Sequence, residues 1–116
     1  MRVLIIITKP PYGSEECFSG LYVAIACLNS ELDCGILFMG DGVYATIANQ
    51  DPKGLSMSSV SDLIYTLLPE SRLYAHEESL RERMLPASSM IKGIRLVDDS
   101  ETAELVLECG EYILTF

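Results

Sequence analysis

The chain has 116 residues, 49% of them apolar, which is enough to bury one hydrophobic core and too few for separate catalytic and regulatory domains. We therefore expect a single domain over residues 1–116. The 17 acidic and 8 basic residues give a net charge of −9, which repels phosphate groups, so we expect neither nucleic acid nor an anionic membrane as a direct partner. No apolar run in the sequence reaches the roughly 20 residues that cross a bilayer, and we expect a cytoplasmic protein.

The cysteine and histidine content argues against a metal site. The four cysteines have no CxxC spacing, and a single histidine offers no second imidazole ligand. We therefore expect no metal and no cofactor. In a reducing cytosol the thiols should be free, and each is then either a small core residue or a reactive nucleophile.

The first part of the chain has the pattern of a strand, a helix and a second strand. Residues 3–7 and 36–39 are unbroken apolar runs, which are typical of strands covered on both faces in a parallel sheet. Between them, apolar residues recur every three or four positions from Phe18 to Leu28, which predicts a helix. Ser14 can cap the start of that helix.

The rest of the chain continues this alternation. A turn at residues 40–42 follows the second strand, and good helix formers follow the third strand directly at His76. The further elements that we expect are a short helix to about residue 49, a polar loop at 50–54, a helix at 59–68, a strand at 72–75, a helix from His76 to Arg83, a strand at 94–97, a helix at 100–109 capped by Asp98, Asp99 or Ser100, and a strand at 112–116.

Strands that alternate with helices indicate a three-layer α/β/α sandwich with a mainly parallel five-stranded sheet, flavodoxin-like in type. With right-handed crossovers, every strand-to-helix turn opens at the same end of the sheet, where the strands have their carboxyl ends. We call this end the carboxyl rim. Ligands and catalytic groups gather there in such folds. The turns that we expect on it are residues 9–14, 40–44 and 75–77.

Two residues of the carboxyl rim are candidates for chemistry. Cys17 lies about three positions into the first helix, where the positive helix end stabilises a thiolate. His76 lies where the third strand meets its helix, and it would serve as a base for Cys17 if the two turns are adjacent. The alternatives are a buried core cysteine and a histidine that bonds the backbone of its own helix start.

The other residues of the rim suit a small ligand or a protein interface. Residues 10–14 can hold an anion at a helix start, although they lack the glycines and the lysine of a phosphate-binding loop. Tyrosine rings are amphipathic and fit an interface as well as a ligand site. The candidates are Tyr12, Gly13, Ser14, Asp41, Gly42, Tyr44 and Tyr74.

Four short stretches, spread over nearly the whole length, carry a resemblance to a known family. They are 11–14 with 20–21, 38–43, 73–74 with 79–83, and 112–116. In order and spacing they resemble the DsrE/DsrF/DsrH superfamily of small sulfur-relay proteins, which includes TusB, TusC and TusD, and the resemblance is strongest to the TusC/DsrF branch.

The resemblance implies a DsrE-like fold in a homo- or hetero-oligomer, such as a trimer or hexamer, in which one subunit type carries a persulfide on a cysteine and passes sulfur between proteins. That cysteine belongs where the third strand meets its helix, and the matching residue here is His76. An imidazole cannot hold sulfane sulfur as a thiolate does. Negative charge at Glu77 and Glu78 also opposes a nearby thiolate.

We therefore expect an accessory subunit of an intracellular sulfur-relay assembly, which binds itself or related subunits and lacks the family cysteine. One alternative is a thiol-active, sulfurtransferase-like carrier in which Cys17 accepts sulfur with His76 nearby. The other alternative is a protein that binds a small ligand or an anion at the same rim.

Overall fold

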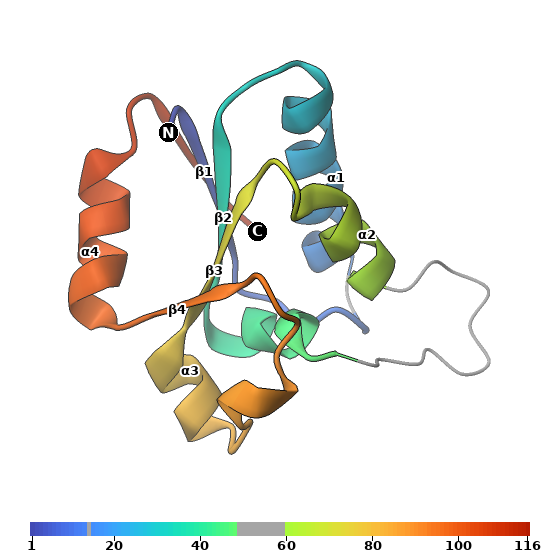
Figure 1. Cartoon of the computed structure of the whole chain (residues 1–116), viewed down its shortest axis with the longest axis vertical. Coiled ribbons are helices and arrows are strands. Elements are labelled where there is room, and N and C mark those ends of the chain that lie inside the picture. The colour runs from blue at the N-terminus through green and yellow to red at the C-terminus, as the bar shows by residue number, and fades with distance from the viewer. Residues whose placement is uncertain (14, 49–59) are drawn as a thin grey trace.

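The computed structural model describes residues 1–13, 15–48 and 60–116, and a five-stranded sheet lies at its centre (Figure 1). The strands are β1 (Val3–Ile7), β2 (Cys34–Phe38), β3 (Arg72–His76), β4 (Arg95–Val97) and β5 (Tyr112–Thr115). They lie in the order β4-β3-β2-β1-β5, and every neighbouring pair is parallel. The expected parallel sheet is confirmed.

The central strands are buried on both faces. Ile5 of β1 lies opposite Ile36 of β2 on one face of the sheet, and the neighbouring Leu4 and Leu37 point to the other face. All four side chains are fully buried. A strand with apolar cover on both sides needs no alternation of polar and apolar residues, which explains the unbroken runs in the sequence.

Helices pack on both faces of this sheet. They are α1 (Glu16–Asn29), the 3₁₀ helix η1 (Gly40–Thr46), α2 (Val60–Leu67), α3 (Glu77–Glu82), the 3₁₀ helix η2 (Ala87–Ser89) and α4 (Asp99–Glu108). Figure 1 shows α1 and α2 on one face of the sheet, α4 on the other, and α3 at the carboxyl rim. Among the helices of the described ranges, none is long and apolar enough to cross a membrane.

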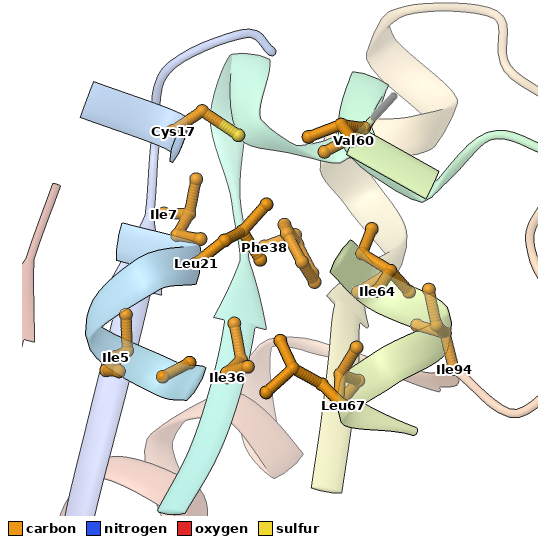
Figure 2. Close-up of a cluster of buried hydrophobic side chains, with 14 of the residues drawn as sticks. Ile5, Ile7, Cys17, Leu21, Ile36, Phe38, Val60, Ile64, Leu67 and Ile94 are labelled. Atoms are coloured by element: carbon orange, nitrogen blue, oxygen red, sulfur yellow. The ribbon is translucent and has the colours of Figure 1, made fainter. Parts of the chain in front are cut away.

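The sheet separates two hydrophobic cores of unequal size. The larger core lies between the sheet and the helices α1 and α2, and Figure 2 shows Ile7, Leu21 and Phe38 within it. The smaller core consists of Leu4, Leu37, Tyr74, Val97 and Leu105. Because Leu105 is the one residue of α4 that is buried, this helix is held by less apolar contact than α1.

The start of α4 is capped by one of the residues that the sequence predicted. Asp98 accepts a hydrogen bond from the backbone N–H of Glu101 at 2.8 Å, and the Glu101 side chain accepts from the N–H of Asp98 at 3.2 Å. This capping box selects Asp98 among the three caps that the sequence allowed. Ser14, the loop at 50–54 and the first residue of the helix expected at 59–68 lie outside the described residues.

The segment after β2 differs from the expectation, because the 3₁₀ helix begins at Gly40 and no separate turn precedes it. Gly40 has a φ of +54°, a left-handed conformation that favours glycine. A Cβ atom on Gly42 would lie 2.0 Å from the carbonyl oxygen of Ile7. The two glycines therefore allow η1 to pack directly against the end of β1.

Candidate functional site

The carboxyl rim brings together four segments that are distant in the sequence. β1 leads into residues 8–13, β2 into η1, β3 into α3, and β4 into α4. Figure 1 shows these strand ends at the lower end of the sheet. Three of the segments contain the turns expected from the sequence, and the fourth, at the start of α4, was not expected to contribute.

His76 is the last residue of β3 and the N-cap of α3, and it is 8% exposed. Its Nδ1 atom accepts a hydrogen bond from the backbone N–H of Ser79 at 3.3 Å and lies 2.7 Å from Ser79 Oγ. Its Nε2 atom lies 2.6 Å from Oδ1 of Asp99. Both ring nitrogens have partners, so His76 is bonded to the start of its own helix, as one of the two interpretations of the sequence proposed.

The network around His76 also assigns its protons. The backbone N–H of Gly40 donates to Ser79 Oγ at 2.9 Å, which leaves the hydroxyl proton free to point at Nδ1. Nδ1 is then an acceptor, and Nε2 carries the proton that is donated to Asp99. The resulting chain of hydrogen bonds joins η1, α3 and α4.

This chain has the residue types of a Ser-His-Asp triad without the geometry of a nucleophile. Ser79 is 6% exposed and its oxygen already accepts from the N–H of Gly40, so it is not presented to a substrate. His76 has no ring nitrogen left to exchange a proton with a bound molecule. The arrangement is suited to hold the rim together.

The charged side chains around His76 are paired with one another. Arg83 donates through Nε to Oδ1 of Asp41 at 3.0 Å and through Nη1 to the carbonyl oxygen of Ser79 at 3.0 Å. Arg81 pairs with Glu77 at 2.9 Å and also with Glu78. Because the acidic partners are exposed, each ion pair contributes at most about 1 kcal/mol to stability. The Arg83–Asp41 pair fixes η1 against the end of α3, while the Arg81 pairs lie within α3 itself.

Cys17 is fully buried in the larger core, among Ile7 and Leu21 in Figure 2. Burial raises the pKa of its thiol from 9.0 to about 12. A thiol with that pKa is protonated at neutral pH and is a poor nucleophile. The ring of His76 is bonded to Ser79 and Asp99, so the structure gives no support to a Cys17–His76 pair.

The other cysteines lie toward the amino end of the sheet. Cys34 is the first residue of β2, and its pKa is raised to about 12, first by burial and then by the neighbouring Cys27 thiol. Cys109 is partly exposed and its thiol lies 3.1 Å from the carbonyl oxygen of Tyr112. Within the described part of the chain, the carboxyl rim therefore presents no thiolate.

The three tyrosines that the sequence placed on the rim have different environments. Tyr12 and Tyr44 line a groove on the rim. Tyr74 lies in the middle of β3, is 8% exposed and packs in the smaller core against α4. Its expected position on the rim is corrected, because a side chain two residues before the end of a strand projects from the face of the sheet.

Two further candidates act through the backbone. Gly13 has a φ of +96° and allows the chain to turn between β1 and α1, while Gly42 makes the close approach to β1 described above. Ser14 lies outside the described residues. The residues that the structure describes contain no cluster of three or more histidine, cysteine or acidic side chains that could hold a metal ion.

The sequence model that describes the DsrE/DsrF-like protein family matches residues 1–116 of this chain. The chain belongs to the DsrE/DsrF-like family. This DsrE/DsrF-like chain is 32% identical over 98 residues to "Intracellular sulfur oxidation protein DsrF" of Allochromatium vinosum, a match that covers 83% of the chain and 71% of the relative. It is 26% identical over 113 residues to "Protein TusC homolog" of Pseudomonas aeruginosa, covering 96% of the chain and 95% of the relative.

Solved structures agree with this assignment. The ychN protein from E. coli is 26% identical and gives a TM-score of 0.88 over 100% of both chains. Protein MTH1491 from Methanobacterium thermoautotrophicum has the same fold, with a TM-score of 0.74 at 16% identity over 99% of this chain and 98% of that one. The resemblance drawn from four stretches of sequence is confirmed.

Three residues that organise the rim were not singled out as site residues from the sequence. Ser79 had a signal, because it follows His76 by three positions, which is the spacing of a capping side chain and its backbone donor. Asp99 follows His76 by 23 positions, and the two meet because β3 and β4 are neighbours. Arg83 and Asp41 are 42 positions apart in the sequence. They meet because the segments that contain them follow the neighbouring strands β3 and β2.

Proposed function

We propose that this DsrE/DsrF-like protein is an accessory subunit of an intracellular sulfur-relay assembly, and that it binds related subunits without carrying sulfur itself. The names of two relatives support the pathway, since one is an intracellular sulfur oxidation protein and the other a TusC homolog. The observation that carries the binding role is the exposed apolar edge strand β5.

β5 ends the sheet and pairs with β1 on one side only. Tyr112, Ile113 and Leu114 are 59%, 45% and 39% exposed. Folded proteins usually protect an edge strand with charged residues, proline or a bulge, and the sequence Tyr-Ile-Leu-Thr of β5 has no charge and no proline. Its main-chain groups and its apolar side chains are both available to a second subunit.

The absence of sulfur transfer by this chain is supported at the strand-to-helix junction of β3. There the family resemblance implies a sulfur-bearing cysteine, and this chain has His76, with both ring nitrogens bonded. Cys17, the cysteine that the sequence places at the carboxyl rim, has a buried thiol whose pKa is raised to about 12. A partner subunit with a reactive cysteine would then supply the thiol chemistry.

The partners that fit are further copies of this chain or paralogues of the same family, in a homo- or hetero-oligomer. An exposed edge strand can pair through its backbone N–H and C=O groups with a second edge strand, and another subunit of the same fold presents one. A trimer or a hexamer is the expected size from the family resemblance.

Light scattering coupled to size-exclusion chromatography tests this role at micromolar concentrations. We expect a mass that is a multiple of the subunit mass, for the chain alone or mixed with a DsrE-family subunit encoded beside it. Ile113→Lys places a charge on the free edge and should reduce the assembly to monomers. Tyr22→Lys is the matched control, because Tyr22 is 55% exposed on α1, and this variant should assemble normally.

Two outcomes would contradict the proposal. One is a wild-type chain that stays monomeric and binds no neighbouring family subunit. The other is an Ile113→Lys variant that assembles as tightly as the wild type while keeping its circular dichroism spectrum.

A further inference from the structure

Two pockets meet between α4 and the β4 edge of the sheet. One has a volume of about 140 Å³ and is lined mainly by α4 and β4. The other has a volume of about 460 Å³ and lies toward the amino ends of β3 and β4. Tyr74 and Arg95 line both pockets, which therefore form one continuous groove. We call it the α4 groove. It lies at the opposite edge of the sheet from β5, so it is separate from the proposed assembly surface.

The strand residues of the α4 groove point to one face of the sheet. Tyr74 of β3 and Val97 of β4 belong to the smaller core, which α4 covers. Side chains two positions apart on a strand share a face, so Arg72 and Arg95 point to the same side. Arg95 is paired with Glu101 of α4 at 2.9 Å. Arg72 is exposed and has no ion-pair or hydrogen-bond partner in the described part of the chain, so its positive charge is free.

Helix α4 supplies the acidic wall of the groove. Glu104 and Glu108 are four positions apart, so they lie on the same side of the helix. Both line the smaller pocket, both are exposed, and neither carboxylate has a partner among the described residues. The acidic side chains that the structure describes form no cluster that could hold a metal ion, so an organic ammonium group is the cation that fits. The groove thus offers free carboxylates in one pocket and a free guanidinium in the other.

Tyr74 adds a polar group without a partner where the two pockets meet. It is 8% exposed, because the smaller core covers its ring. Its hydroxyl has no hydrogen-bond partner among the described residues, and it is not one of the fully enclosed oxygens, so a molecule in the groove can reach it. A hydroxyl that a buried ring holds in place and that lacks a partner is expected where a ligand provides that partner.

We propose that the α4 groove binds a small zwitterionic molecule, whose ammonium group lies beside Glu104 and Glu108 and whose carboxylate accepts from Arg72 and from the hydroxyl of Tyr74. The net charge of −9 attracts the ammonium end, while the carboxylate end needs the local guanidinium. Because the free carboxylates line one pocket and Arg72 lines the other, the two charges of the ligand need a spacer of several bonds. A short aliphatic amino acid with its amino group at the far end of the chain has this form.

Three probes of similar chain length separate the two charges. ε-Aminocaproate carries both charges, hexylamine has a methyl group in place of the carboxylate, and caproate lacks the ammonium group. Nuclear magnetic resonance of the backbone amides of Tyr74, Arg95 and Leu105 in the full chain reports on the groove. We expect saturable shifts with ε-aminocaproate, at an affinity at least about fivefold higher than that of either singly charged probe.

Three variants assign the contacts within the groove. Arg72→Gln removes the free guanidinium and should weaken ε-aminocaproate binding about fivefold without weakening hexylamine binding. Tyr74→Phe removes only the hydroxyl oxygen and should have the same selective effect. Glu104→Gln removes a free carboxylate and should weaken the binding of ε-aminocaproate and of hexylamine alike.

Lys9→Gln and Glu15→Gln are the matched controls for these changes of charge. Both residues are exposed and lie between β1 and α1, at the other end of the sheet from Arg72. Neither control should change the affinity for any of the three probes. Circular dichroism checks that every variant keeps its fold, which is expected because Arg72 and Glu104 are exposed and Tyr74→Phe keeps the ring.

Several results would overturn the proposal. One is the absence of any saturable shift with ε-aminocaproate. Another is equal affinity for ε-aminocaproate and hexylamine, which would mean that the acidic surface attracts any ammonium ion. A third is a Tyr74→Phe variant that binds ε-aminocaproate as tightly as the Lys9→Gln control does. Shifts that depend on protein concentration without any probe would show that a second copy of the chain fills the groove, and the small-molecule assignment would then be wrong.

Discussion

Cys17 lies in the first turn of α1, where two physical effects on a thiol oppose each other. The partial charge of a helix start stabilises a thiolate by about 0.3–1 kcal/mol. Burial acts in the other direction, and a pKa raised from 9.0 to about 12 corresponds to roughly 4 kcal/mol. Burial therefore decides the chemistry of this residue, and the sequence position alone suggests a reactivity that the packing removes.

We expect Cys17 to accept no sulfur from a sulfane-sulfur donor at neutral pH, because its thiolate is too scarce and too enclosed to attack. Intact mass followed by peptide mapping measures this directly, with Cys17→Ser as the control variant. Cys109, which is partly exposed, provides an internal comparison within the same sample. A sulfur adduct on Cys17 of the folded protein would contradict the accessory role and favour the thiol-active alternative.

The same pKa shift gives a sign for the pH dependence of stability. Folding raises the pKa of Cys17, so its contribution to the free energy of unfolding is complete below pH 9 and declines as the pH rises from 9.0 toward about 12. The raised pKa of Cys34 acts in the same direction over the same range. The wild type should accordingly lose more stability than Cys17→Ser in this alkaline range.

At the scale of elements, the sequence predicts the helices and strands well and their neighbours poorly. The apolar run of β1 and the capping residues of α4 are local signals, so these elements were placed within a residue or so. The order of the strands is a long-range property. It decides that Asp99 at the start of α4 meets His76 at the start of α3, and no local pattern contains that contact.

The His76 network yields a prediction about stability, because it ties these elements together. His76→Ala removes the cap of α3 and leaves the buried groups of Ser79 without their acceptor, so it should lower the free energy of unfolding by about 2–3 kcal/mol. Asp99 is 85% exposed in its side chain, and Asp99→Ala should cost less than about 1 kcal/mol. Urea unfolding of the two variants measures both.

The ranking of these two variants is the informative result. If Asp99→Ala costs as much as His76→Ala, the tie between α3 and α4 matters more than the cap. If His76→Ala unfolds like the wild type, the network is not structural, and a role of His76 in binding or proton transfer would have to be reconsidered.

At the scale of the whole molecule, composition bounds the class of protein but does not locate its surfaces. The apolar content correctly predicts a chain that folds around a buried sheet, and the alternation of elements predicts its layers. The apolar residues of β5 were recognised as a strand, yet their exposure depends on β5 lying at the edge of the sheet beside β1. The groove beside Tyr12 has the same origin, since its lining residues come from three separate segments.

The net charge of −9 and the apolar edge of β5 together predict how salt acts on assembly. Two copies of the chain repel each other over a distance of about one Debye length, which is about 10 Å at 0.1 M salt and shorter at higher salt. The contact through β5 is apolar and is not weakened by screening. If β5 forms the interface, raising sodium chloride from about 0.05 M to about 0.5 M should tighten self-association several-fold. Sedimentation velocity over a range of protein concentrations measures this change. Ile113→Lys is the control variant, because it should stay monomeric at every salt concentration. Dissociation of the wild-type assembly by salt would show that ion pairs hold it, and the interface would then have to lie on the charged surfaces of α3 or α4.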